Sequence, residues 1–231
     1  MKKFYEKNET LISLGLIVIY LITNSYCMNN FGLEDIKTLI ANIILTVLIV
    51  MFVLLNKLGE YLGLTHFPKP KQYLYFIPLV ILMAVNLIGG INIKLSVTEI
   101  VIYMVSMVCV GFLEEIIFRG FLFQMIAKDN IKVAIIVTSI TFGIGHIINL
   151  LNGAELIPTL LQICYAITTG YLFAVILVKS KSIWPQIITH SVVNALSVFN
   201  AENFITIYIS PVILIIVPLI YALYLNKKIK E

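Results

Sequence analysis

Charged residues are scarce in this sequence. They make up 12% of the 231 residues, whereas hydrophobic residues make up 60%, and the mean hydropathy is +1.02. A soluble domain usually has about a quarter charged residues and somewhat under half apolar ones. A soluble fold of this length would leave much of its apolar surface in water, at a large cost in free energy. The composition therefore favours an integral membrane protein whose surroundings are the lipid bilayer, and it indicates no nucleic-acid partner.

Cysteine is also rare. Cys27, Cys109 and Cys164 each lie in or beside an apolar run, without CxxC or zinc-type spacing, so a disulfide framework is not supported. The first apolar run, residues 10–27, lacks a small-x-small cleavage site, which favours a retained transmembrane helix over a signal peptide. Internal repeats and low-complexity tracts are missing as well. We therefore predict a single integral-membrane domain over residues 1–231.

Long apolar runs are what the sequence does have. A helix needs about 20 apolar residues to cross the ~30 Å hydrocarbon core of a bilayer. Eight runs approach or exceed this length: 10–27, 36–56, 73–91, 99–126, 133–151, 156–178, 183–199 and 204–225. The predicted fold is an all-α membrane protein, a polytopic bundle of about eight transmembrane helices.

The lysines fall almost entirely into one set of the loops that these spans define. That set contains Lys2, Lys3, Lys7, Lys57, Lys69, Lys71, Lys128, Lys132, Lys179, Lys181, Lys227, Lys228 and Lys230. The opposite set contains Lys37 and Lys94. Because short cytoplasmic loops are enriched in Lys and Arg, both termini are predicted to be cytoplasmic. We expect a multi-pass protein of the plasma membrane, and the abundance of Ile, Asn and Lys favours an AT-rich bacterial genome.

Ionisable residues inside the spans are costly and usually functional. In the fourth span, Glu115 and Arg119 lie four residues apart, so they share a helix face and are predicted to form an ion pair. Glu114 points about 100° away from Glu115 and is free to act on something else. An ion pair that merely fixes helix packing would explain Glu115 and Arg119, but it would leave Glu114 buried without a partner.

A histidine ends the polar part of the fifth span. Phe142 and His146 are four residues apart and share a helix face. Gly143 and Gly145 are predicted to permit close approach of a neighbouring helix. His146 is a candidate for catalysis, and its alternative role is a hydrogen bond between helices.

The seventh span carries a polar stripe. Gln186, His190 and Asn194 follow one another at intervals of four, and Ser197 lies seven residues beyond His190. This face of an otherwise apolar helix should point into the bundle. Asn194 is predicted to orient the His190 ring, and a purely structural polar seam is the alternative.

The candidate residues of the three spans can share one layer of the bundle. Glu114 precedes the loop at 128–132 by 14 residues and His146 follows it by 14, so each lies ~21 Å along its helix from that loop. His190 and Asn194 reach similar depths from the preceding lysine loop, at ~14 and ~20 Å. Because the fourth span is long, we expect a water-filled route to Glu114 from the cytoplasmic side.

A carboxylate beside two histidines suits activation of a water molecule. Glu114 would act as the general base, and His146 would share the water and help to protonate the leaving amine. His190 and Asn194 would bind the developing oxyanion. In the alternative, Glu114, His146 and His190 would bind zinc and Glu115 would be the base. The sequence has no HExxH motif, so we favour water activation without a cofactor, and zinc remains the alternative.

Together these residues make three motifs on three helices: Glu114-Glu115-x-x-x-Arg119, Phe142-x-x-x-His146 and His190-x-x-x-Asn194. In this order they resemble the CPBP family of CAAX prenyl endopeptidases and bacteriocin-processing enzymes, also called Abi proteins. The resemblance covers a catalytic core of about residues 97–200, with no departure at the catalytic positions. It implies an eight-helix intramembrane endopeptidase in which Glu114 and His146 activate water. The family has been described both as metalloproteases and as glutamate proteases.

The resemblance implies a membrane-embedded or lipid-anchored peptide or protein as substrate. The roles that it suggests are peptide maturation, bacteriocin self-immunity and regulated proteolysis, and no residue pattern chooses among them. Two other classes are open at this point. One is a proton- or ion-coupled transporter, although the two halves show no repeated pair of interrupted helices. The other is a non-catalytic bacteriocin-immunity protein.

Overall fold

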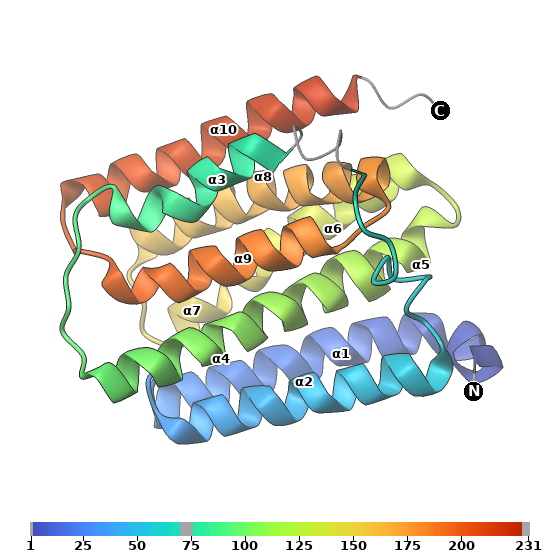
Figure 1. The fold of residues 1–231 in the computed structure, drawn as a ribbon, viewed down its shortest axis with the longest axis horizontal. Coiled ribbons are helices and arrows are strands. Elements are labelled where there is room, and N and C mark those ends of the chain that lie inside the picture. Colours follow the sequence, from blue (N-terminus) through green and yellow to red (C-terminus); the bar gives the residue numbers. More distant parts are fainter. Residues whose placement is uncertain (1, 70–75, 228–231) are drawn as a thin grey trace.

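The computed structural model of the protein describes residues 2–69 and 76–227, and this part of the chain is a bundle of helices (Figure 1). The α-helices are α1 (Lys2–Asn30), α2 (Ile36–Asn56), α3 (Ile77–Ala84), α4 (Val97–Glu115), α5 (Phe123–Ala127), α6 (Ile131–Gly145), α7 (Ile148–Leu151), α8 (Leu156–Ser180), α9 (Trp184–Leu196) and α10 (Ser210–Asn226). Two short 3₁₀ segments are η2 (Val85–Leu87) and η4 (Ser197–Phe199), and two π-helical segments are η3 (Ile116–Leu122) and η5 (Ile205–Ile209).

The predicted all-α membrane bundle is confirmed, with six helices long and apolar enough to cross a membrane among the described residues. These are Phe4–Asn30, Ile36–Asn56, Val97–Ala127, Ile131–Leu151, Leu156–Ser180 and Ile205–Asn226. Two of the eight predicted spans correspond to shorter helices. The apolar helix at Ile77–Leu87 begins with a proline in its first turn, and residues 73–75 of the predicted span lie outside the described ranges. Helix α9 has 13 residues, or ~20 Å, less than the hydrocarbon core.

Local sequence signals account for the ends of the central helices. Ser96 accepts a hydrogen bond from the backbone of Glu99, whose carboxylate in turn accepts one from the Ser96 backbone nitrogen. This capping box fixes the start of α4. Asp35 caps α2 in a similar way by accepting from the Lys37 backbone nitrogen. Short polar turns therefore set where these two helices begin.

Helix α4 occupies the centre of the bundle, between the α1–α2 pair and α9 (Figure 1). A methyl group built on Gly111 would lie 2.7 Å from the backbone nitrogen of Ser191, so α4 and α9 approach each other closely at this point. Helix α8 packs between α6 and α10 on the far side. This arrangement brings the three helices that carry the sequence motifs to a common interior.

The lysine-bearing loops lie at one end of the bundle. Helix α1 begins there and α10 ends there (Figure 1). Lys57, Lys128 and Lys181 follow the ends of α2, α5 and α8 at this same end. Lys128 forms an ion pair with Glu9 of α1. We refer to this as the lysine end. Lys71, Lys228 and Lys230 lie outside the described residues.

Candidate active site

Glu115 and Arg119 form the predicted ion pair. Arg119 Nη1 donates to Glu115 Oε1 at 3.1 Å, and both side chains are completely buried. The guanidinium carbon of Arg119 lies 4.1 Å from the centroid of the Phe142 ring and 5.7 Å from that of Phe173. Cation–π contacts of this kind replace part of the hydration that the buried cation has lost. Phe142 thus contributes to the site through its ring, in addition to sharing a helix face with His146.

A glycine on α8 makes room for the arginine. A methyl group built on Gly170 would lie 2.7 Å from Arg119 Nη2, closer than normal van der Waals contact. Gly143 on α6 plays a comparable part against α8, since its methyl group would lie 2.9 Å from the Ile163 carbonyl oxygen. Gly145, by contrast, has no neighbouring atom within 4 Å of such a group. Close helix approach was therefore predicted correctly at Gly143, and Gly145 plays no part in it.

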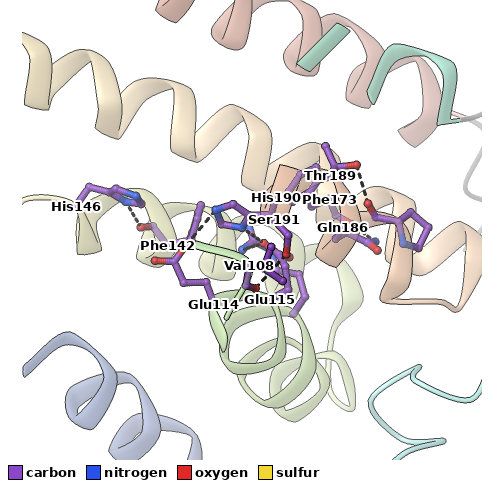
Figure 2. A network of polar contacts seen from close by, with 12 residues as sticks. Val108, Glu114, Glu115, Phe142, His146, Phe173, Gln186, Thr189, His190 and Ser191 are labelled. Carbon is purple, nitrogen blue, oxygen red and sulfur yellow. Dashed lines mark hydrogen bonds and ion pairs between the residues drawn. The ribbon is translucent and has the colours of Figure 1, made fainter. Parts of the chain in front are cut away.

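His190 lies between the two glutamates of the first motif (Figure 2). Its Nδ1 is 2.7 Å from Glu115 Oε1, and its Nε2 is 3.2 Å from Glu114 Oε2. A neutral imidazole has one N–H, so it can donate to one carboxylate only, whereas an imidazolium can donate to both. With a charged His190, the two glutamates, Arg119 and His190 together carry no net charge. This balance makes the burial of four ionisable groups acceptable.

Tyr20 of α1 is a further partner of the site, and the sequence motifs do not include it. Its hydroxyl donates to Glu114 Oε1 at 2.5 Å, and its side chain is buried. Helix geometry left Glu114 free to act on another group, and its two oxygens contact Tyr20 and His190. The signal that could have identified Tyr20 is its spacing of four residues from Asn24 within an apolar span, which marks a polar face of α1.

His146 is the residue that follows the last turn of α6. Its Nδ1 lies 3.1 Å from the Phe142 carbonyl oxygen, and its ring packs edge-on against the Phe142 ring with centroids 5.2 Å apart. A carbonyl oxygen can only accept, so Nδ1 carries the hydrogen. In the neutral ring, Nε2 then holds the lone pair. His146 lines the same cavity as Glu114 and His190, as the matching depths predicted.

The structure does not bring Asn194 into the predicted contact with His190. Both nitrogens of the His190 ring are taken up by carboxylates, and no hydrogen bond joins the two side chains within the described part of the chain. Asn194 instead lines the cavity. Gln186, the first member of the polar stripe, is completely buried and donates to the Phe173 carbonyl oxygen. The stripe therefore divides into a packing residue, a histidine bound to carboxylates and an amide that faces the cavity.

The helix that carries both glutamates changes its winding directly after them. Residues 116–122 are π-helical, and α5 continues the same rod to Ala127. A π-helical turn has one more residue than an α-helical turn, and such turns are frequent at functional sites. All seven residues of η3 are buried. The wider turn lies where the buried guanidinium of Arg119 has to be accommodated.

A cavity of about 410 Å³ joins these side chains. Glu114, His146, His190 and Asn194 line it, while Glu115 and Arg119 lie behind its wall. The cavity thus exposes one carboxylate and two imidazoles, and the network behind them holds Glu114 in place. This arrangement can bind a water molecule next to an acceptor and present it to a carbonyl group.

The residues named for the zinc alternative are not arranged as a ligand set. Among residues 2–69 and 76–227, no group of three or more His, Cys, Asp and Glu side chains could hold a metal ion. At this site each nitrogen of the His190 ring contacts a glutamate oxygen, whereas a zinc ligand would need a free nitrogen. The three cysteines are unpaired. Water activation without a cofactor, with zinc as its alternative, stays a prediction.

The comparisons with known proteins agree with this geometry. Residues 96–196 match the family model described as type II CAAX prenyl endopeptidase Rce1-like. A search of curated proteins found no match. The matched segment runs from the residue that caps α4 to the end of α9, so it includes all three motifs, and it confirms the resemblance that they carry. Residues 96–196 are therefore similar to the type II CAAX prenyl endopeptidases of the Rce1-like family.

Proposed function

We propose that the protein is an intramembrane endopeptidase that hydrolyses a peptide bond of a membrane-embedded or lipid-anchored peptide or protein. The observation that carries the proposal is that Glu114 and His146, from two different helices, line one cavity within the bundle. Hydrogen bonds from Tyr20 and His190 hold Glu114 in place. The match of residues 96–196 to the family model supports the class of reaction, and peptide maturation or bacteriocin self-immunity are the roles that we propose for it.

The reaction begins with a water molecule between Glu114 and His146. Glu114 accepts a proton from this water, and the water oxygen forms a bond to the carbonyl carbon of the scissile peptide. The lone pair on His146 Nε2 accepts a hydrogen bond from the same water, because Nδ1 already donates to Phe142. When the C–N bond breaks, the proton passes to the leaving amine. Atoms and charge therefore balance without a cofactor.

The carbonyl oxygen becomes negatively charged in this step and needs a hydrogen-bond donor. We expected both His190 and Asn194 to supply one. The Asn194 amide lines the cavity and is the donor that we now favour. His190 already binds two carboxylates, so we assign it a positioning role: it links Glu114 to the buried Glu115–Arg119 pair.

The test is cleavage of a membrane-anchored peptide by the purified protein in lipid vesicles. Glu114→Gln and His146→Ala should abolish cleavage, since each removes a group that holds the water. Glu155→Gln is the matched control, because Glu155 is an exposed carboxylate outside the cavity. Full activity in Glu114→Gln and His146→Ala would overturn the proposal. Ion flux sensitive to the same variants, without cleavage, would favour a transporter. Binding of a bacteriocin with neither activity would favour an immunity protein.

A further inference from the structure

His146 lies at a break in the helical hydrogen bonding between α6 and α7. Its backbone nitrogen donates to the Gly143 carbonyl oxygen at 3.1 Å. The Ile147 nitrogen donates to the Ile144 carbonyl oxygen at 2.9 Å, so both bonds span three residues rather than the four of an α-helix. A short stretch of such bonds within a helical rod often marks a hinge. Helix α6 alone therefore does not fix the direction in which the chain leaves His146.

The α7 segment, residues 148–152, continues from this break. Within it, none of the helical residues Ile148–Leu151 is buried. Its backbone is joined to the site, since the Asn149 nitrogen donates to the His146 carbonyl oxygen at 3.0 Å. Lipid surrounds an apolar side chain as favourably as protein does, so the exposed apolar residues of α7 do not fix its position. Polar contacts are the interactions available to hold it.

Two asparagines supply such contacts, one toward each neighbouring helix. Asn149 Nδ2 donates to Gln162 Oε1 of α8 at 2.8 Å. Asn152 accepts two hydrogen bonds from α1 through its Oδ1, from Ser25 Oγ at 2.7 Å and from Asn29 Nδ2 at 2.8 Å. In the described part of the chain, each side-chain hydrogen bond between α1 and the α7 segment involves Asn152. The link between these two elements therefore depends on one side chain.

Helix α1, at the other end of this link, also holds the proposed base. Tyr20 of α1 donates to Glu114 Oε1, and Ser25 lies five residues further along the helix, or ~7.5 Å. A route of contacts thus runs from Glu114 through Tyr20 into α1. It continues from α1 through Asn152 to the turn that begins at His146. Glu114 and His146 line one cavity from different helices, so a change in this route would alter the distance between them.

We propose that Asn152 is a positioning residue, which holds His146 at the correct distance from Glu114 by tying α7 to α1. The proposal rests on the proposed endopeptidase function, because the two groups have to share one water molecule. Asn152 itself takes no part in the chemistry. A displacement of about 1 Å can lower a rate a hundredfold, so loss of the tie should slow the reaction rather than weaken binding of the peptide.

Two substitutions of Asn152 separate this tie from other roles of the side chain. Leucine has a similar shape without an acceptor, whereas aspartate keeps an acceptor oxygen for both donors of α1. Asn152→Leu should lower kcat of the purified protein in lipid vesicles at least about tenfold and change KM by less than about twofold. Asn152→Asp should restore most of the rate, because the hydrogen bonds that the tie needs are retained.

The α1 side of the tie gives an independent check. Ser25→Ala combined with Asn29→Ala removes both donors and should reproduce the loss seen in Asn152→Leu. Adding Asn152→Leu to this pair should cause little further loss, because all three changes disrupt one contact. Asn30→Ala is the matched control, since Asn30 is exposed and donates to the Tyr26 carbonyl oxygen within α1. It should behave as wild type.

The histidine ring signals test the position of His146 without catalysis. The chain has three histidines, so isotopic labelling of their ring nitrogens gives few NMR signals in detergent, and His146→Ala assigns one of them. Asn152→Leu should shift or broaden the His146 signal. The signal of His66, in the loop after α2, should not change. Asn152→Asp should leave both signals close to those of wild type.

An unchanged kcat or an unchanged His146 signal in folded Asn152→Leu would overturn the proposal. An increase in KM alone would also overturn it, because Asn152 would then contact the peptide. So would equal losses in Asn152→Leu and Asn152→Asp, since the acceptor oxygen would then be unimportant. If the wild type cleaves no peptide, the endopeptidase function fails, and the His146 signal still decides whether Asn152 positions that ring.

Discussion

At the scale of single residues, Glu114 differs from Glu115 in what surrounds it. Glu115 is completely buried and faces Arg119 and His190. Glu114 keeps 13% of its side chain exposed to the cavity and faces Tyr20 and His190. A carboxylate has about four acceptor sites, so Glu114 can still bind a water molecule. The two adjacent glutamates therefore have different surroundings, which supports the proposal that Glu115 positions and Glu114 acts as the base.

Tyr20→Phe should lower kcat about ten- to a hundredfold and leave KM nearly unchanged. The hydroxyl donates to the Glu114 carboxylate, and a hydrogen bond to a charged group contributes about 1.5–3 kcal/mol. Its loss frees Glu114 to rotate away from the water without changing the contacts of the peptide. Kinetics of the purified variant measure this split. Tyr26→Phe, at an exposed position of the same helix, should behave as wild type; an unchanged kcat in Tyr20→Phe would show that the contact has no catalytic role.

Arg119→Met should destabilise the protein by about 3–5 kcal/mol, because it leaves Glu115 buried with its main counter-ion gone. Thermal unfolding in detergent measures the effect. The double variant Arg119→Met, Glu115→Gln should recover much of the lost stability, since the unpaired charge is then absent. Equal destabilisation in the single and double variants would mean that Arg119 acts through packing on Phe142 and Phe173 rather than through its charge.

Residue spacing predicted some of these contacts and could not predict others. Glu115 and Arg119 are four apart on one helix, so their pairing follows from helix geometry. Tyr20 and Glu114 are 94 positions apart, and no local pattern states which face of α1 meets α4. The histidine contacts also depend on the bundle, since His190 reaches both glutamates only because α4 and α9 lie close together.

At the scale of helices, Gly111 controls that close approach. Gly111→Ala would place a methyl group 2.7–2.8 Å from the Ser191 backbone, so α9 would have to move away from α4. The contacts of His190 with Glu114 and Glu115 would lengthen, and activity should fall at least about tenfold, because small displacements of catalytic groups are costly. Peptide cleavage and thermal unfolding measure the two consequences.

Gly15→Ala is the matched control for this prediction. Gly15 lies in the membrane helix α1, and a methyl group built there would have no atom within 4 Å. It should retain activity and gain slightly in stability, as alanine favours helix over glycine. Normal activity in Gly111→Ala would show that α9 tolerates displacement, and the short distance between the helices would then be unimportant for catalysis.

The apolar runs predicted where the helices lie along the chain. They did not predict which segments are π-helical or how long each helix is. The predicted 36–56 span matches α2 at both ends, and 99–126 nearly matches the rod from α4 to α5. The π-helical winding of η3 has no sequence signature, because it depends on what the surrounding helices leave room for. Helix α9 likewise ends at Leu196, where the chain continues as the 3₁₀ segment η4, and the apolar run did not predict this change.

At the scale of the whole molecule, the two ends of the bundle differ in charge. The lysine distribution is readable from the sequence, because it depends only on the order of spans. The direction in which the cavity opens cannot be predicted from the sequence. It depends on which end of the bundle is filled by large side chains such as Phe121. The number of residues from the 128–132 loop predicted that Glu114 and His146 lie at the same depth in the bundle. It could not predict at which end of the bundle the cavity opens.

The purified protein as a whole should require no bound zinc for activity. A three-ligand zinc site would have to take His190 from at least one of the glutamates, and that glutamate would then lose a partner that it has in the folded bundle. Elemental analysis should give far less than one zinc per chain, and chelation before the assay should leave peptide cleavage unchanged. Stoichiometric zinc, with activity lost on chelation and restored by zinc but not by magnesium, would instead mean that His190 leaves Glu114 in the active protein. The base would then be Glu115, and Glu115→Gln rather than Glu114→Gln would abolish cleavage while zinc stayed bound.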